Sequence, residues 1–275
     1  MKHFNGRVAA ITGAGSGIGR ALAEELARRG ANLALADIDE VGLAETVALC
    51  EGSGVKVASQ QLDVADRDAV YAWAEAVVEE YGTVNLVINN AGVALAATVD
   101  GMSYDDFEWL MGINFWGVVY GTKAFLPHLE ASGEGHIVNL SSVFGLVSIP
   151  SQSAYNAAKF AVRGFTDSLR MELEIAKSAV STTTIHPGGI KTNIARSARV
   201  DDSVTAMAGV RDTAEEFDKL ARTTPDQAAQ QILAAVEKNK RRATVGPDGR
   251  VIDFISRLPA GFYQRILVQG LRRRR

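Results

Sequence analysis

Short apolar runs alternate with longer, helix-like segments along most of this chain. The apolar runs lie at 8–12, 32–36, 56–62, 86–88, 137–140, 181–185 and 243–245. Strands that alternate with helices of this length predict a parallel sheet with helices on both of its faces. Right-handed crossovers then give a doubly wound α/β fold, in which ligands bind at the carboxyl ends of the strands.

Length and composition indicate how this fold is organised. The 275 residues are enough for one large α/β domain, and we expect residues 1–250 to form it. The stretch 190–225 is the least regular part, and we interpret it as a flap over the substrate. No apolar run reaches the roughly 18 residues that a membrane-spanning helix needs, so we expect a cytoplasmic protein.

Charge and metal-ligand patterns exclude two classes of function. A formal net charge of −3 gives no reason to expect nucleic-acid binding. The single cysteine cannot supply a thiolate zinc site, and the four histidines are scattered without metal-ligand spacing. We therefore expect no metal site, and we interpret each histidine as structural or solvated.

A glycine-rich turn follows the first apolar run. Gly13, Gly17 and Gly19 stand in the pattern Gly-x-x-x-Gly-x-Gly, with Ser16 and Ile18 among them. Glycines here let the backbone approach a pyrophosphate, and the N-terminus of the following helix offers N–H donors to it. A P-loop is excluded, because Gly19 is followed by arginine and alanine. We predict a dinucleotide site, with a ligand-free structural turn as the alternative.

Asp37 follows the second apolar run, about 20 residues after the glycine turn. A carboxylate there accepts hydrogen bonds from the adenosine ribose hydroxyls and repels a 2′-phosphate. Neither Ser16 nor Ile38 is basic, so these positions offer no cradle for such a phosphate. We therefore predict NAD as the cofactor and NADP as the less favoured choice.

Tyr155 and Lys159 lie one helical turn apart and share a helix face. A phenol beside a fixed ammonium has its anion stabilised, so we expect the pKa of Tyr155 to fall toward neutrality. Such a phenol can exchange a proton with an alcohol or a carbonyl oxygen. Alone, this spacing occurs in many helices and would favour an ordinary surface pair.

Taken together, these motifs resemble the short-chain dehydrogenase/reductase family from about residue 4 to residue 192. The resemblance rests on an ordered set: the 12–19 turn, Asp63-Val64, Asn89-Asn90-Ala91-Gly92, Asn114, Ser141-Ser142, Tyr155-x-x-x-Lys159 and Pro187-Gly188. It implies a single Rossmann-like domain around a seven-stranded sheet. It also implies reversible hydride transfer between a nicotinamide and an alcohol or carbonyl compound, in a homodimer or homotetramer.

The resemblance assigns catalytic roles to four residues. Tyr155 is implied to be the general acid/base, and Lys159 to lower the tyrosine pKa and hold the nicotinamide ribose. Ser142 is implied to hydrogen-bond the substrate oxygen; only Ser142 or Ser141 can face the site, because adjacent strand residues point to opposite faces. Asn114 is implied to keep a water-linked proton path to Lys159, and it can also be a buried amide that satisfies helix backbone.

Other residues match positions that contact the cofactor in that family. Those implied to meet adenine are Asp63 and Val64, and those implied to border the adenine ribose are Asn90, Ala91 and Gly92. The segment implied to contact the nicotinamide carboxamide contains Pro187, Gly188, Ile190 and Thr192. The resemblance implies transfer of the pro-S hydride.

The chain continues past residues 246–249, where many members of the family end. The extension 251–275 has apolar residues near helical spacing and several arginines, a pattern typical of helices that lie on an anionic membrane. Pro259 and Gly261 interrupt the helical pattern. We therefore favour a tail packed on its own domain or on a partner subunit, and keep peripheral membrane contact as the alternative.

These observations predict an NAD(H)-dependent oxidoreductase. Apolar residues are plentiful in 190–225 and at 143–147, which favours a hydrophobic secondary alcohol or its ketone as the substrate. The alternatives are a nucleotide-binding regulatory protein with little turnover and a membrane-associated scaffold. A serine hydrolase is disfavoured, because Ser142 lacks a Gly-x-Ser-x-Gly elbow.

Overall fold

The fold is built on a seven-stranded parallel sheet. A computed structural model describes residues 1–208 and 221–272. The sheet has the strand order β3-β2-β1-β4-β6-β7-β9. Its strands are β1 (Val8–Thr12), β2 (Asn32–Asp37), β3 (Val57–Gln61), β4 (Leu86–Asn89), β6 (Gly135–Leu140), β7 (Val180–Pro187) and β9 (Arg242–Val245). All seven predicted strands are present, and the predicted doubly wound α/β class is confirmed.

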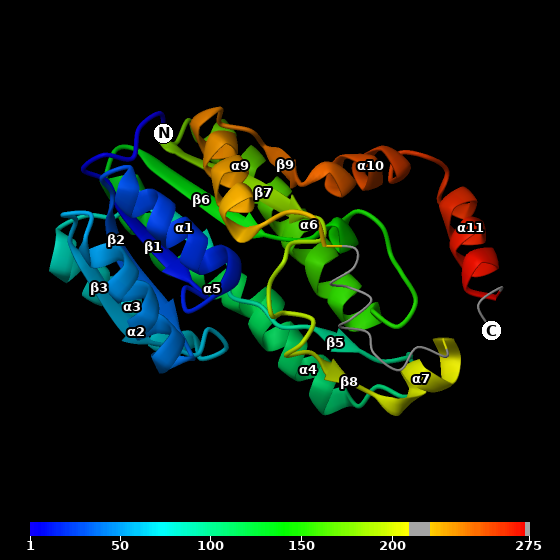
Figure 1. The fold of residues 1–275 in the computed structure, drawn as a ribbon. Helices are drawn as coiled ribbons and strands as arrows, with labels where there is room; N and C mark the ends of the chain where they lie inside the picture. Colours follow the sequence, from blue (N-terminus) through cyan, green and yellow to red (C-terminus); the bar gives the residue numbers. More distant parts are fainter. Residues whose placement is uncertain (209–220, 273–275) are drawn as a thin grey trace.

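Helices cover both faces of this sheet (Figure 1). One face carries α1 (Gly17–Arg28), α2 (Glu40–Glu51) and α9 (Pro225–Glu237). The other carries α3 (Arg67–Tyr81), α5 (Gly117–Ala131) and α6 (Ser153–Ile175). Alternate residues of the central strands supply the two cores: Ile11 packs toward α1, and its neighbour Ala10 packs toward α3 and α5.

The order of the strands reverses between β1 and β4. Helices that follow β1 cover one face, and those that follow β4 cover the other, so the two connections leave the sheet in opposite directions. This divergence opens a crevice at the carboxyl ends of the strands, where doubly wound folds bind their ligands.

Shorter elements surround the carboxyl edge of the sheet. The connection from β4 to α5 contains β5 (Leu95–Ala96), α4 (Tyr104–Met111) and a single π-helical turn, η1 (Gly112–Trp116). A 3₁₀ turn, η2 (Val143–Gly145), follows β6. The segment after β7 contains β8 (Arg199–Val200), which pairs with β5, and α7 (Asp202–Ala208). The predicted flap at 190–225 lies partly outside the described residues.

The C-terminal extension forms two helices, α10 (Pro247–Ile255) and α11 (Ala260–Arg272). The break between them falls at Pro259, one of the two positions predicted to interrupt the helix. Figure 1 shows α10 close to the sheet and α11 projecting from the main body. In the described part of the chain, no helix combines the length and hydrophobicity needed to cross a membrane.

Candidate active site

The glycine turn between β1 and α1 is held against the end of β4. Gly13 and Gly17 have φ angles of 65° and 54°, which L side chains rarely adopt. A Cβ on Gly13 would lie 2.8 Å from the Cα of Ala91. Asn90 donates from Nδ2 to the carbonyl oxygens of Thr12 (2.9 Å) and Gly13 (3.0 Å). These contacts fix the backbone close to the crevice and leave no room for side chains.

The N-terminus of α1 opens into the same crevice. Ser16 occupies the N-cap position in an extended conformation, but its side chain makes no capping hydrogen bond. The first N–H groups of a helix lack intrahelical partners, and they favour an anion. Ile18 and Gly19 lie in this first turn, and a Cβ on Gly19 would clash with the carbonyl group of Gly13. The turn therefore has the shape and polarity of a phosphate cradle.

Asp37, at the end of β2, lies beside the glycine turn. Its Oδ2 accepts a hydrogen bond from the Gly15 N–H at 2.7 Å, and its Oδ1 accepts one from the Asp39 N–H at 2.9 Å. Each carboxylate oxygen keeps further lone pairs for a ligand. Asp37 therefore lies beside the glycine turn, as predicted.

Arg20 is a cation near this turn that the sequence reasoning did not consider. Its guanidinium donates to the carbonyl oxygens of Gly15 and Gly42 at 2.5 and 3.1 Å and pairs with Glu45 at 2.8 Å. Its Nε donates to the Thr46 hydroxyl at 3.0 Å. Arg20 thus ties α1 to α2 through its Nε and Nη2 atoms.

Asp63 and Val64 follow β3 at the same edge of the sheet. Asp63 is exposed, and its Oδ1 accepts a hydrogen bond from the Ala65 N–H at 2.9 Å. The Val64 side chain is buried against α5, where a Cβ on Gly117 would lie 2.8 Å from Val64 Cγ2. The Val64 side chain is buried, whereas the Asp63 side chain is exposed, so Asp63 is the more accessible of the two to a ligand at this edge.

Tyr155 and Lys159 lie in the first turns of α6, as the spacing predicts. The Lys159 Nζ is 5.5 Å from the centroid of the Tyr155 ring and donates to the Leu140 carbonyl oxygen at 3.0 Å. Lys159 is buried, and this burial lowers its pKa to about 8.

The expected fall in the pKa of Tyr155 is wrong for this structure. Burial raises the pKa of Tyr155 to about 12, although the nearby Ser142 acts in the opposite direction. The ammonium lies over the ring and donates to a backbone carbonyl group, so it does not offset the loss of solvation at the phenol oxygen. The spacing correctly predicted that Lys159 lies near Tyr155, but it predicted the wrong direction for the shift in the pKa of Tyr155.

Ser141 and Ser142 point in different directions, as expected for neighbours at a strand end. The Ser141 hydroxyl donates to the Lys159 carbonyl oxygen at 2.8 Å. Ser142 is close enough to the Tyr155 phenol to lower its pKa, and its Oγ accepts from the Phe144 N–H at 3.1 Å. Ser142 is therefore the serine that faces the tyrosine, and Ser141 fixes α6 to the end of β6.

Asn114 is buried in η1, the π-helical turn. Its Oδ1 accepts from the Val93 N–H and its Nδ2 donates to the Val93 carbonyl oxygen, both at 2.8 Å. The Asn114 amide therefore hydrogen-bonds the backbone of the loop that follows β4. The alternative expectation, that it satisfies helix backbone, is wrong. A Cβ on Gly92 would lie 3.1 Å from Asn114 Oδ1 and 3.6 Å from Lys159 Nζ. Asn114 and Lys159 therefore border the same backbone position.

The segment after β7 reaches back over the glycine turn. Pro187 ends β7, and the Gly188 N–H donates to the Val245 carbonyl oxygen at 3.0 Å. Ile190 is buried. The methyl group of Thr192 lies 3.0 Å from where a Cβ on Gly17 would stand. This segment thus packs against the glycine turn at the carboxyl edge of the sheet.

Two residues that support the site escaped the sequence reasoning. His186 Nδ1 donates to the Ser142 carbonyl oxygen at 2.7 Å, and burial lowers the pKa of His186 to about 4, so it is neutral at pH 7. Asp248 Oδ2 accepts from the Gly189 N–H at 2.6 Å. His186 is next to the last residue of β7, and this place at a strand end was a usable signal. Asp248 is distant in sequence, and nothing in its local pattern indicated the contact.

The site residues are spread along the carboxyl edge of the sheet. Asp37 follows β2 and Ser142 follows β6, three strands away in the order β2-β1-β4-β6. Three strand spacings of about 4.8 Å separate them by about 14 Å. A ligand that contacts both ends must therefore be elongated. Among the described residues, no group of three or more His, Cys, Asp and Glu side chains could hold a metal ion.

Comparison with known proteins gives the class to which this fold and site belong. The family model of the short chain dehydrogenases matches residues 7–203. The chain therefore belongs to the short-chain dehydrogenase family, and it is an oxidoreductase. SadH of Mycobacterium tuberculosis strain H37Rv, named as an oxidoreductase, is 52% identical over 272 residues, which are 98% of this chain and 97% of SadH.

A further relative and two solved structures are similar to the chain. Human estradiol 17-beta-dehydrogenase 11 is 40% identical over 196 residues, 70% of this chain and 64% of that protein. A Burkholderia phymatum short chain dehydrogenase/reductase in complex with NAD has a TM-score of 0.84 and 33% identity, with 98% and 97% of the two chains covered. A Thermococcus sibiricus alcohol dehydrogenase complexed with 5-hydroxy-NADP has a TM-score of 0.73 and 27% identity, with 87% and 95% covered.

Proposed function

We propose that the protein interconverts a hydrophobic secondary alcohol and its ketone, or an aldehyde, with NAD(H) as cofactor and Tyr155 as general acid/base. One observation carries this proposal. Tyr155 lies close to two groups that act on a phenol: Ser142, which lowers its pKa, and the buried Lys159, whose Nζ is 5.5 Å from the centroid of its ring; these residues lie on the same edge of the sheet as the glycine turn. We further propose a cytoplasmic homodimer or homotetramer, as the sequence analysis expects.

The residues present fit a nicotinamide dinucleotide. Gly13 and Gly17 have positive φ angles, and neither position has room for a Cβ at the mouth of α1. The cradle therefore accepts a phosphate close to backbone N–H groups. The bound dinucleotide would supply or accept a hydride. Near Tyr155, Lys159 Nζ would hold the hydroxyl groups of the nicotinamide ribose; this atom lies 3.6 Å from where a Cβ on Gly92 would stand.

Asp37 supports NAD over NADP. Its carboxylate lies at the glycine turn, where it can accept from ribose hydroxyls and repels a 2′-phosphate. Arg20 pairs with Glu45 through Nη2, so part of its positive charge is already offset by an acid of this chain. The similar Burkholderia phymatum structure holds NAD and the Thermococcus sibiricus structure an NADP derivative, so the fold accommodates both cofactors and Asp37 carries the argument.

The catalytic side chains have separable roles in this proposal. Ser142 can donate to a substrate oxygen and stabilise developing negative charge on it. Tyr155 is neutral at pH 7, since its pKa is about 12, and in reduction it can give its proton to the forming alkoxide. Lys159, with a pKa of about 8, carries its proton in most molecules at pH 7 and fixes a positive charge beside the phenol.

An apolar environment around Tyr155 supports a hydrophobic substrate. Phe144 meets the Tyr155 ring edge to face at 6.2 Å between centroids. Tyr155 also packs against a hydrophobic cluster that contains Leu95 and Leu110. Burying apolar surface contributes about 25 cal/mol per Å², so such walls favour an apolar substrate over a polar one. The similarity to an estradiol dehydrogenase supports the same class.

Replacing Tyr155 tests the catalytic proposal. In a screen of hydrophobic secondary alcohols with NAD, Tyr155→Phe should lower turnover by about 10²–10⁴-fold, because proton transfer is lost. NADH binding, followed by its fluorescence, should stay nearly unchanged. Tyr104→Phe is the matched control, since Tyr104 is 88% exposed. Turnover by Tyr155→Phe at the wild-type rate would assign the acid/base role to another group.

Fluorescence titration tests the cofactor assignment. Wild-type protein should bind NADH more tightly than NADPH, and Asp37→Asn should narrow the difference, because the repulsion of the 2′-phosphate is removed. Asp68→Asn is a matched control at an exposed acid on α3. Tighter binding of NADPH by the wild-type protein would refute the role of Asp37.

A further inference from the structure

The C-terminal helices present apolar side chains that the rest of the described chain does not cover. Phe254 on α10 is 67% exposed, and Phe262 and Ile266 on α11 are 57% and 56% exposed. Phe262 and Ile266 are four residues apart, so they lie on one face of α11. The helix touches the main body at Tyr263, whose hydroxyl accepts from the Ser148 N–H at 3.4 Å. The tail, predicted to pack on its own domain or on a partner subunit, thus leaves an apolar face that the described residues do not cover.

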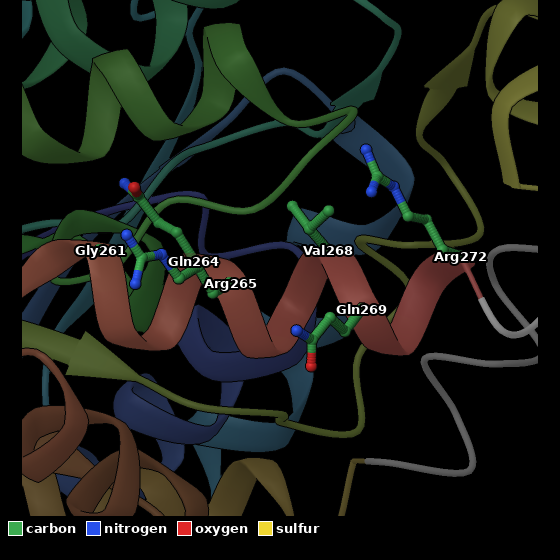
Figure 2. A pocket seen from close by; sticks show the side chains of 6 residues that line it. All are labelled: Gly261, Gln264, Arg265, Val268, Gln269 and Arg272. Atoms are coloured by element: carbon green, nitrogen blue, oxygen red, sulfur yellow. The ribbon is translucent and has the colours of Figure 1, made fainter.

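A different face of α11 is polar and basic. Arg265 and Arg272 are seven residues apart, which places them on one face about two turns from each other. Figure 2 shows Val268 and Arg272 projecting from the same side of α11. A depression of about 300 Å³ lies along this face, but all of its lining residues belong to α11. One helix cannot enclose a small molecule, so we assign no ligand pocket there.

Charge is distributed unequally along the chain. Residues 247–275 contain seven arginines and two aspartates, a net charge of +5, whereas the whole chain has −3. Residues 1–246 therefore carry a net charge of −8. No acidic residue occurs from 254 onward, so α11 has no acidic side chain of its own to complement its arginines.

We propose that α10 and α11 dock the protein onto an anionic lipid surface. An amphipathic helix with an exposed apolar face and a basic polar face is suited to the boundary between lipid headgroups and acyl chains. The positive tail attracts such a surface, and the negative remainder of the chain is repelled by it, so the tail approaches first. A symmetric contact between two copies of α11 would instead bring like charges together.

Docking in this way brings the catalytic edge of the protein near the lipid. Tyr263 contacts Ser148, which lies in the connection between η2 and α6, and η2 directly follows Ser142. A hydrophobic substrate dissolved in the bilayer would then lie close to the site. This consequence rests on the proposed function, whereas the docking itself does not.

Vesicle sedimentation with the full-length protein tests the docking. We expect wild-type protein to bind vesicles with roughly one-third phosphatidylglycerol at least tenfold more tightly than pure phosphatidylcholine vesicles. Arg265→Gln with Arg272→Gln should weaken this binding about 25-fold, because each arginine near the surface contributes about 1 kcal/mol. Phe262→Gln with Ile266→Gln should weaken it by at least about tenfold, because apolar burial is lost.

Matched control variants distinguish the effect of substitutions in the tail from the effect of similar substitutions elsewhere on the protein surface. Arg67→Gln on α3 and Ile175→Gln at the end of α6 change an exposed arginine and an exposed isoleucine elsewhere, and both should bind vesicles like the wild type. The assay needs neither cofactor nor substrate, so its result is independent of the oxidoreductase function, which the NADH titration tests separately.

Three results would overturn the proposal. The wild-type protein could fail to sediment with anionic vesicles, or it could bind neutral and anionic vesicles equally. In the third result, the wild-type protein would not bind vesicles, and the double variant Phe262→Gln with Ile266→Gln would have a lower mass than the wild type by light scattering. That last result would assign the apolar face to a second copy of the chain.

Discussion

Two buried histidines should make the protein sensitive to acid, and His136 offers the cleaner test. Its Nε2 donates at 2.8 Å to the Thr183 hydroxyl, which itself donates to the Lys240 carbonyl oxygen, so the neutral ring carries its proton on Nε2. Its Nδ1 is buried and has no partner among the described residues. Burial, together with the positive charges of the N-terminus and Arg170, lowers the pKa of His136 to about 3.

The sign and size of the effect follow from proton linkage. Between the folded pKa of about 3 and the unfolded value of 6.5, the unfolded chain binds more protons than the folded one. Stability therefore falls as the pH is lowered through this window. From pH 7 to pH 5, His136 should cost about 2 kcal/mol of unfolding free energy, and His186, with a pKa of about 4, should cost about the same. Together they remove about 4 of the 5–15 kcal/mol typical of a domain.

Chemical denaturation at pH 7 and pH 5, at one protein concentration, measures this loss. His136→Gln keeps a donor where Nε2 stands but cannot titrate, so its loss between the two pH values should be about 2 kcal/mol smaller than that of the wild type. The exposed His3 supplies the control, and His3→Gln should behave like the wild type. An equal loss in His136→Gln and the wild type would refute the argument that His136 is held neutral by burial.

Two truncations and one substitution test other parts of the structure. Removing residues 259–275 should leave NADH binding and stability close to those of the wild type. A truncation after Arg250 should destabilise the protein, because it removes Asp253, which pairs with Arg242 at 3.5 Å. Denaturation curves of both truncations distinguish them, and equal stability would contradict the packing of α10. Gly92→Ala should fold but lose turnover, since its Cβ would lie 3.1 Å from Asn114 Oδ1 and displace the group that borders Lys159. Wild-type kinetics in Gly92→Ala would contradict this placement.

Much of the fold could be predicted from the sequence, because its signals are local and repeated. Each buried strand is a short apolar run, and the parallel order follows from the helices between the runs. The glycine turn at 13–19 was recognisable because it needs backbone conformations that few other residues adopt. Strand alternation predicts that Ser141 and Ser142 diverge but not which of them faces Tyr155; only the family resemblance favoured Ser142.

The rest depends on contacts between residues far apart in the chain. The π-helical turn that carries Asn114 has no distinct sequence signal, and the partner of Asn114 is backbone that follows another element. Asp248 meets Gly189 across 59 positions. His186 lies at a strand end that the sequence predicts, but this position does not indicate its partner, the Ser142 carbonyl group. Such contacts follow from tertiary packing, which periodicity does not describe.

The relation between Tyr155 and Lys159 shows why a motif alone does not determine chemistry. Proximity to an ammonium favours the phenolate, while burial disfavours both charged forms, and the balance depends on where the ammonium points. Here Lys159 Nζ donates to the Leu140 carbonyl group, and the pKa values of about 8 and about 12 mean that Lys159 loses its proton before Tyr155 does. The protein without ligands therefore has a neutral phenol, which is ready to donate a proton in reduction. In the proposed reaction, oxidation of an alcohol requires the phenolate, and Ser142 is the neighbour that lowers the pKa of Tyr155. We therefore propose that Ser142 assists the acid/base role of Tyr155 as well as substrate binding, which the spacing between Tyr155 and Lys159 could not indicate.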